Sequence, residues 1–322
     1  MMMRKRLDLA KAERIVEMRG VSSLECYRFP DGTLRRVLQD ITLLVKRSEV
    51  WGITCDEPFE MALLMEIMGN IKPYEGGRCS LSQLGMMRSK RRVLEHVFYI
   101  NDQMLMYPHM DVLSWLMFAS QHTGGTAAAR QTEWLELLLA LDLHYLTLTY
   151  SRVLTAAEQA VVALLLTLKM SRVQLVLLDL SHIEVPLTLY PAFSGIFERL
   201  HAQDKAIVLA TAQRDLIQRC AQYAAFLLRG KLERQGTVEE LCEKYDKRRL
   251  LVRAGDPGRL TSVLSDAFSG VRIVEREGEA WTCEERLKVS EVAAALERSG
   301  VGFEDIEIAQ PSLELAFREV AS

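Results

Sequence analysis

The residues that could do chemistry are few, and they gather where apolar runs end. Three carboxylates, Asp56, Glu57 and Glu60, follow directly on a short apolar run, and Asp179 ends a longer one. Acidic side chains at the start of a helix complement its dipole. The first three therefore have a simple interpretation as a solvated loop and helix N-terminus.

Cysteine and histidine usage does not point to a metal or redox site. The six cysteines are scattered and include no C-x-x-C pair, so neither a zinc site nor a disulfide framework is predicted. A reduced, cytosolic protein fits this pattern best. The six histidines fall at unrelated spacings, which is typical of surface or core polar residues.

Composition excludes several classes of protein. The chain has 322 residues, 49% of them hydrophobic, with 40 basic and 43 acidic residues and a net charge of −3. These values exclude disorder and a strongly basic nucleic-acid binder, and the length predicts about two domains. The longest apolar stretch, 160–166, is much shorter than the roughly 20 residues of a membrane span. We therefore expect a soluble protein, or one attached to a membrane only through a partner.

Apolar runs and helical patterns alternate along most of the chain, so that a strand, a loop and a helix surround the acidic residues 56–60. This alternation predicts an α/β domain over residues 15–245, after a basic extension over 1–14. The expected strand-rich segments are 14–24, 34–45, 48–54, 97–100, 175–179, 206–210 and 224–228. The expected helical segments are 60–69, 111–145, 156–170, 193–200 and 213–220.

The last quarter of the chain has a different pattern. A charged run, YDKRR at 245–249, marks the expected boundary. Residues 246–322 then follow the order strand, helix, strand, strand, helix, strand, with one further helix at the end. This order predicts a small α+β domain of the ferredoxin-like kind, built on a split βαβ unit.

Several segments together resemble the nucleotide-binding subunit of an ABC transporter. They are VLQDITLLVKRSEVWGIT (37–54), ALLMEIMGNIKPYEGG (62–77), YPHMDVLSWLMF (107–118), LTAAEQAVVALLLTL (154–168), LVLLD (175–179) and RGKLERQGTVEEL (229–241). The spacing agrees over residues 15–245, although each motif is altered. The resemblance implies a P-loop NTPase-like ABC ATPase fold, in which a mixed sheet carries a helical subdomain. The C-terminal piece, with PSLELAF (311–317), is similar to the accessory domain of multidrug and antibiotic export ATPases.

The segment that corresponds to the family's phosphate loop, or Walker A motif, is the most altered. The family pattern is G-x-x-x-x-G-K-[ST], whose backbone N–H groups and lysine hold the phosphates. The corresponding residues here are Cys55, Asp56, Glu57, Pro58, Phe59, Glu60, Met61 and Ala62. Glu60 falls about where the lysine belongs, and Pro58 lacks an N–H. One like-charge pair at about 4 Å costs roughly 4 kcal/mol at an effective dielectric near 20, so we do not expect ordinary phosphate binding.

The family's signature segment, LSGGQ, is also changed. Its counterpart comprises Leu154, Thr155, Ala156, Ala157, Glu158 and Gln159. Thr155 keeps a hydroxyl group. The two alanines add methyl groups where the resemblance implies that the backbone approaches the γ-phosphate of a partner's nucleotide.

By the resemblance, Asp179 corresponds to the Mg²⁺-binding aspartate of Walker B, and its metal role could be intact. The plainer interpretation is a helix cap or a hydrogen-bonding residue at the end of a strand. Leu180 stands where the family has its catalytic glutamate, and Ala212 where it has its switch histidine. We therefore expect no intact catalytic residue.

Two further positions of the family pattern remain ambiguous here. Asp102 and Gln103 compete for the position of the loop glutamine, and Gln103 is the candidate for a catalytic or coupling role. Tyr27, with Phe29 as second choice, could be the aromatic residue that stacks on adenine. A half-buried strand aromatic is the simpler interpretation of Tyr27.

By the resemblance, the helical segment 111–145 corresponds to the subdomain that receives the membrane subunit. Ordinary core packing is the alternative for its apolar residues Leu113, Trp115, Leu116, Met117 and Phe118. The basic clusters 4–6 and 88–92 could contact lipid headgroups or a partner. They are otherwise solvated surface.

The resemblance implies a cassette subunit of an ABC exporter at the inner face of the cell membrane. Its partners would be a membrane subunit and a second, active cassette, in a homo- or heterodimer. The altered motifs predict a structural or regulatory pseudo-ATPase that holds ATP and Mg²⁺ only if the altered site still binds them. The alternatives are a subunit still active in ATP binding and hydrolysis within a heterodimer, and a binding module unrelated to transport.

Overall fold

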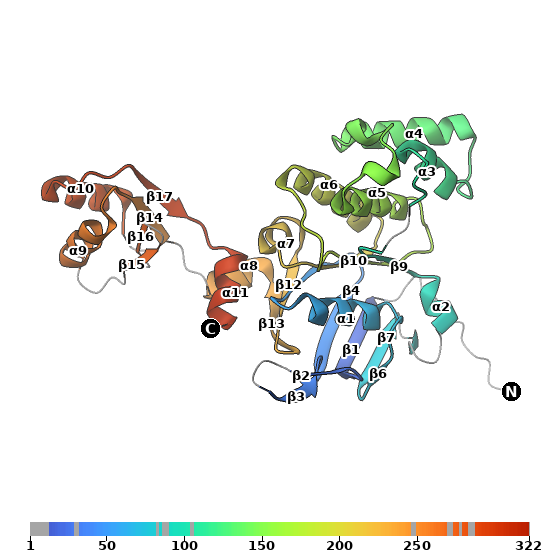
Figure 1. Ribbon diagram of the computed structural model, residues 1–322, viewed down its shortest axis with the longest axis horizontal. Coiled ribbons are helices and arrows are strands. Elements are labelled where there is room, and N and C mark those ends of the chain that lie inside the picture. The colour runs from blue at the N-terminus through green and yellow to red at the C-terminus, as the bar shows by residue number, and fades with distance from the viewer. Residues whose placement is uncertain are drawn as a thin grey trace. The chain divides into compact units, whose positions relative to one another are not determined.

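The computed structural model describes residues 13–28, 32–81, 84–85, 90–103, 106–245, 249–268, 273–276, 279–282 and 287–321. The chain forms two compact units, Met1–Gly236 and Thr237–Ser322 (Figure 1). The division places helix α8 (Val238–Tyr245) in the second unit. The boundary expected from the sequence lies at the other end of this helix.

A six-stranded sheet forms the centre of the first unit, in the order β13-β12-β5-β11-β10-β9. Its strands are β5 (Val50–Thr54), β9 (Val97–Ile100), β10 (Leu175–Asp179), β11 (Ala206–Ala210), β12 (Tyr223–Leu228) and β13 (Lys231–Thr237). Every residue of β5, β10 and β11 is buried, which confirms the strands expected from their apolar runs. Five neighbouring strands of this sheet, β9, β10, β11, β5 and β12, run parallel to one another. The loops after β5, β10 and β11 therefore meet at one edge of the sheet.

A second, antiparallel sheet packs against the first through a shared core. It contains β1 (Arg14–Ser23), β4 (Ile41–Lys46), β6 (Tyr74–Glu75), β7 (Arg78–Leu81) and β8 (Leu84–Gly85), and a separate hairpin joins β2 (Cys26–Arg28) to β3 (Leu34–Arg36). Helix α1 (Pro58–Met68) contributes its apolar residues to the same core.

The segment 34–45 is rich in strand, as expected, and residues 37–40 separate β3 from β4 within it. Val37 and Leu38 are buried there, and Asp40 takes a positive φ of 51°. The Asp40 N–H donates to the Ser22 hydroxyl at 3.1 Å instead of to a strand neighbour.

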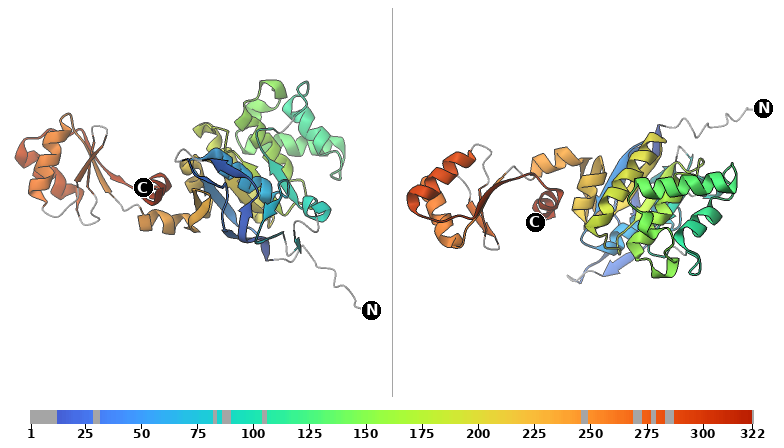
Figure 2. Two further views of the ribbon diagram at one scale, coloured as in Figure 1. Left: turned by 60° about the horizontal axis from the view of Figure 1, so that its bottom comes forward. Right: turned by 90° about the horizontal axis from the view of Figure 1, so that it is seen from above.

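Helices cover the sheets, and α3 and α4 form an outer layer (Figures 1 and 2). They are α2 (Lys90–Leu94), α3 (Val112–Ala119), α4 (Ala127–Ala140), α5 (Ala156–Thr167), α6 (Tyr190–Ala202) and α7 (Arg214–Cys220), with short 3-10 turns at 144–146, 151–153 and 187–189. Asp111, Thr126 and Thr155 each cap a helix with a side-chain oxygen. These caps fix where α3, α4 and α5 begin. Within the described part of the chain, we find no helix with the length and apolarity needed to cross a membrane.

The second unit contains the expected element order. Its elements are α8, β14 (Arg249–Arg253), α9 (Pro257–Ala267), β15 (Ile273–Arg276), β16 (Glu279–Thr282), α10 (Val289–Ser299), β17 (Asp305–Ala309) and α11 (Leu313–Ala321). The antiparallel sheet has the order β15-β16-β14-β17, so β16 lies between β14 and β15 as in a split βαβ unit. Leu260, Leu264 and Val292 belong to its separate core, and α11 packs against α8.

Candidate functional site

The candidate site lies at the edge of the central sheet where β5, β10 and β11 end. Residues 55–57 connect β5 to α1, whose first residue is Pro58. Glu57 occupies the N-cap position but makes no capping hydrogen bond with its side chain. Asp56 and Glu57 are exposed, whereas Glu60 in the first helical turn is completely buried. The three acids therefore do not form one solvated group.

Glu60 is held by a backbone amide from a distant turn. Its Oε2 accepts the N–H of Gly230 at 2.9 Å and contacts the Cys55 Sγ at 3.5 Å. Burial raises the pKa of the Glu60 carboxyl group, and the hydrogen bond from Gly230 opposes that rise. Gly230 has a φ of 77°, and a methyl group added to it would collide with the Val37 carbonyl. The turn that presents this N–H to Glu60 therefore requires glycine.

Asp56 forms an ion pair with Arg214, the first residue of α7. The side chain of Arg214 is only 9% exposed, whereas that of Asp56 is 66% exposed. Beside them, the Cys55 Sγ accepts the Glu57 N–H at 3.3 Å. Burial raises the pKa of the Cys55 thiol well above its usual range. The loop between β5 and α1 is thus tied to the segment that follows β11.

Asp179 makes hydrogen bonds at the end of β10, as its simpler interpretation predicted. Its Oδ2 accepts the Tyr99 hydroxyl at 2.8 Å, and its Oδ1 accepts the Ser181 N–H at 3.1 Å and the Ser181 hydroxyl. Asp179 is 6% exposed. Burial, and then the charge of Asp179, raise the pKa of Tyr99. The roles of Tyr99 and Ser181 were not predicted from the sequence, although a serine two residues after an aspartate is a recognisable turn signal.

The two positions that correspond to the catalytic glutamate and histidine lie in different environments. Leu180 is 1% exposed and Ala212 is exposed. The residue after Ala212, Gln213, accepts the Val185 N–H at 2.7 Å and donates to the Val185 carbonyl at 2.9 Å. This pair of hydrogen bonds joins the loops after β10 and β11. The role of Gln213 was not predicted from the sequence, because its partner Val185 lies 28 residues away.

Tyr27 contacts the Walker A counterpart through Phe59, whereas Gln103 makes a local hydrogen bond. Tyr27 belongs to β2 and is 47% exposed, and its ring centre lies 5.0 Å from that of Phe59 at an interplanar angle of 41°. Phe29, the second choice, lies outside the described residues. Gln103 and Asp102 are exposed, and the Gln103 N–H donates to the Asn101 side chain at 3.2 Å.

The signature counterpart forms the N-terminus of α5. Thr155 accepts the Glu158 N–H at 3.2 Å, and the Glu158 carboxylate accepts the Thr155 N–H at 2.8 Å, which completes a capping box. Gln159 donates to the Leu154 carbonyl at 3.2 Å. Ala156 is exposed and Ala157 is buried. The polar side chains of this segment therefore make local hydrogen bonds.

In the segment expected to receive the membrane subunit, some apolar residues pack in the core and others are exposed. Trp115 and Leu116 are buried, so core packing accounts for them. Phe118 is 44% exposed and meets the ring of Tyr107 edge-on at 5.5 Å. Of the basic clusters, residues 4–6 and 88–89 lie outside the described residues, and Arg91 is exposed.

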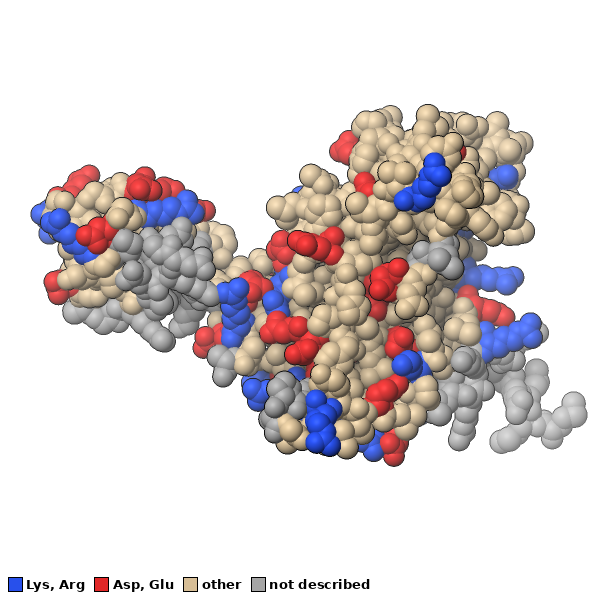
Figure 3. Space-filling model, viewed as in Figure 1, with Lys and Arg blue, Asp and Glu red and all other residues tan. Residues whose placement is uncertain are grey.

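The remaining features of the site are the distribution of charged side chains on the surface and the positions of possible metal ligands. On the face shown in Figure 3, acidic and basic side chains are interspersed, without a continuous basic surface. In the part of the chain that the structure describes, no group of three or more His, Cys, Asp and Glu side chains is arranged to hold a metal ion.

The arrangement of the helices and strands identifies the fold of the first unit. The α/β sheet, the antiparallel sheet and the helical layer of this unit match several solved ABC cassettes. The first unit has the ABC ATPase fold. The ATP-binding subunit of an ABC transporter matches with a TM-score of 0.56 and 16% identity, covering 72% of this chain and 93% of that one. The cassette MJ0796, solved as a dimer with ADP and phosphate, matches with a TM-score of 0.55 and 15% identity, over 69% of this chain and 98% of that one.

A third solved structure supports the same fold. The protein cbiO1 from Clostridium perfringens, part of the transporter complex cbiONQ, matches with a TM-score of 0.55 and 15% identity. The match covers 73% of this chain and 95% of that one. Neither a protein-family model nor a curated protein matches the sequence. At these identities the likeness establishes the fold alone.

Proposed function

We propose that this chain is a cassette subunit of an ABC-type export complex that does not use ATP at its own site. It serves as a structural or regulatory part, at the inner face of the cell membrane. The observation that carries the proposal is the buried Glu60 carboxylate on the Gly230 N–H. In this segment an ATPase needs a lysine and open backbone amides.

The residues present do not fit the phosphates of a nucleotide. Glu60 already takes one backbone N–H, and the exposed carboxylates Asp56 and Glu57 would repel a polyanion. The guanidinium group of Arg214, at this edge of the sheet, already pairs with Asp56. Phosphate binding would therefore require an ion pair to break and carboxylates to be protonated or displaced.

The adenine and Mg²⁺ positions are also filled by the chain itself. Phe59, in the first turn of α1, lies against the ring of Tyr27, where the resemblance would place adenine. Both carboxylate oxygens of Asp179 accept hydrogen bonds from Tyr99 and Ser181. We propose that these internal contacts replace those that a nucleotide and its metal ion would make.

Thermal unfolding tests this proposal with the full chain. A ligand that binds only the folded state at 100 times its Kd adds about 2.7 kcal/mol of stability. We expect 5 mM Mg·ATP to leave the Tm unchanged relative to 5 mM Mg²⁺ with inorganic phosphate. A rise in Tm that is specific to ATP would refute the proposal.

The proposed partners are a polytopic membrane subunit and a second cassette. The likeness to cassettes from transporter complexes and dimers supports this assembly. The exposed aromatic pair Tyr107 and Phe118 offers apolar surface to such a partner. Affinity purification from detergent-solubilised membranes tests this, and recovery of the chain only as a soluble monomer would contradict it.

A second candidate function keeps ATP turnover in a heterodimer, at a site completed by this chain. The exposed N-terminus of α5, at Thr155 and Ala156, favours it because the backbone N–H groups and the dipole of a helix N-terminus can face an anion. Comparing ATP turnover by the co-purified pair and by the partner alone tests this function. Equal rates would reject it.

A further inference from the structure

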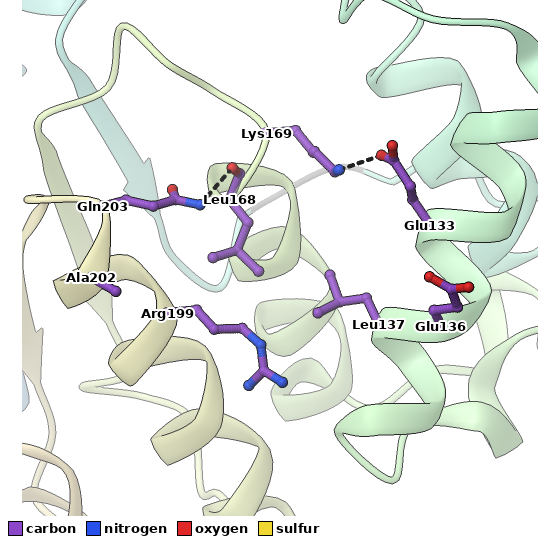
Figure 4. Close-up of a pocket in the computed structure, with 8 residues that line it drawn as sticks. All are labelled: Glu133, Glu136, Leu137, Leu168, Lys169, Arg199, Ala202 and Gln203. Atoms are coloured by element: carbon purple, nitrogen blue, oxygen red, sulfur yellow. Dashed lines mark hydrogen bonds and ion pairs between the residues drawn. The ribbon is translucent and has the colours of Figure 1, made fainter.

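A cavity of about 540 Å³ lies between helices α4 and α6 and the end of α5 (Figure 4). It shares no lining residue with the candidate site at the edge of the sheet. Its volume falls within the range of cavities that hold small ligands. The proposed function assigns no role to this cavity.

The two walls of the cavity carry opposite charges. Glu133 and Glu136 project from α4, whereas Arg199 comes from α6 and Lys169 follows α5 (Figure 4). Apolar surface lies between the charged groups, provided by Leu137 and Leu168. A ligand that fits would therefore need charges of both signs, joined by an apolar stem.

Two of these four charged side chains form an ion pair with each other, and the other two do not. Lys169 forms an ion pair with Glu133. Arg199 donates one Nη1 hydrogen bond to the Gly195 carbonyl at 2.7 Å, which leaves further guanidinium donors. Across the described residues, no ion pair includes Arg199 or Glu136. A guanidinium and a carboxylate thus remain available on opposite walls.

We infer that this cavity binds a small zwitterion, an amino acid whose ammonium and carboxylate groups are separated by a short apolar stem. Its carboxylate pairs with Arg199, whose planar guanidinium matches a carboxylate bidentately. Its ammonium pairs with Glu136, and its stem covers Leu137 and Leu168. A ligand with only one charge makes only one of these two charge-assisted contacts.

Occupation of the cavity would connect two layers of the first unit. Glu136 belongs to α4 in the outer helical layer, and Arg199 belongs to α6, which contacts β11 of the central sheet. The bound zwitterion would therefore join the outer layer to the central sheet, as the Lys169–Glu133 ion pair already joins α4 to the end of α5.

Isothermal titration of the full chain with 6-aminohexanoate tests the inference. We expect saturable binding, at least about tenfold tighter than that of hexanoate or hexylamine, because each analogue loses one charge-assisted contact. Arg199→Gln and Glu136→Gln should each weaken binding of 6-aminohexanoate by about tenfold or more. Arg130→Gln is the matched control: Arg130 also donates Nη1 to a backbone carbonyl, at 2.8 Å, but does not line the cavity.

A charge exchange separates ligand recognition from a structural role. Arg199→Glu alone and Glu136→Arg alone should abolish binding, because each gives positions 136 and 199, which make the two proposed ligand contacts, the same charge. The double variant should restore binding, since a zwitterion can turn round. Absence of saturable binding to the unmodified chain, equal binding of hexanoate, or unchanged binding by Arg199→Gln would each overturn the inference. Circular dichroism establishes that each variant is folded.

Discussion

At the scale of single residues, Glu60 determines how the loop between β5 and α1 is built. A fully buried carboxyl group is costly unless it is hydrogen-bonded or protonated. Glu60 meets this cost through the N–H of Gly230, with burial raising its pKa. A lysine at this position would place its ammonium group, a hydrogen-bond donor, against the Gly230 N–H, which is also a donor.

Replacing Glu60 by glutamine should change how stability depends on pH. The pKa of Glu60 is raised in the folded state, so the folded protein binds more protons than the unfolded chain between pH 4.5 and the folded pKa. Stability from this group is therefore present at acidic pH and lost as the pH rises through the folded pKa. Glu60→Gln should stabilise the protein at pH 8 relative to the unmodified chain, and less so at pH 5.

Urea unfolding of both proteins at several pH values measures this difference. Glu57→Gln is the control, because Glu57 is exposed. It should change the free energy of unfolding by less than about 0.5 kcal/mol at any pH. A constant difference between Glu60→Gln and the unmodified chain would contradict the account of Glu60.

Tyr99→Phe removes the hydroxyl group that donates to Asp179 at 2.8 Å. Because Asp179 is nearly buried, we expect the free energy of unfolding to fall by about 1–2 kcal/mol. Tyr145→Phe, at a tyrosine that is 53% exposed, should change it by less than about 0.5 kcal/mol. Equal effects of the two variants in urea titrations would show that the Tyr99 hydroxyl has no structural role.

At the scale of elements, burial decides what the sequence could predict. Strands β10 and β11 were predicted because full burial demands continuous apolar runs. Strand β13 was missed because its exposed, charged residues give no such pattern. The ion pair between Asp56 and Arg214 joins residues 158 apart in the chain. No local sequence pattern predicts a contact between residues so far apart in the chain.

The packing of β5 against α7 depends on Gly52. A methyl group at this position would collide with the side chain of Ile217. Gly52→Ala should therefore destabilise the protein by about 1–3 kcal/mol through overpacking. Ile217→Ala should relieve part of that cost, so the double variant should lose less stability than the sum of the two single variants.

Gly124→Ala provides the control for this prediction, since among the described residues no atom beyond Gly124 and its two chain neighbours lies within 4 Å of the added methyl group. It should change the free energy of unfolding by less than about 0.5 kcal/mol. Strict additivity of Gly52→Ala and Ile217→Ala in urea unfolding would contradict direct packing between the two residues.

At the scale of the whole molecule, the two units have separate hydrophobic cores. The core of the first contains Ile15, Ile53 and Leu64, and that of the second contains Leu260 and Val292. The predicted β-α-β-β-α-β order of the second unit was confirmed. This order was predictable because the short elements of the unit have clear periodic patterns of apolar residues. The hydrogen bonds within the candidate site were not predictable in the same way, because they join separate loops.

A fragment of residues 1–236 should fold without the second unit. Each unit forms its own compact set of contacts, so the fragment retains its complete sheet core. We expect one cooperative transition in thermal unfolding, followed by circular dichroism. A fragment that aggregates, or unfolds without cooperativity, would show that the first core depends on residues 237–322.

We propose above all that the chain itself fills the position where a cassette holds ATP. Isothermal titration of the full chain with Mg·ATP tests it most directly, with Mg²⁺ and inorganic phosphate titrated as the control. The contacts of Glu60, Asp56 and Asp179 predict no saturable binding up to about 1 mM nucleotide. Saturable binding of Mg·ATP with a Kd in the micromolar range would contradict the claim.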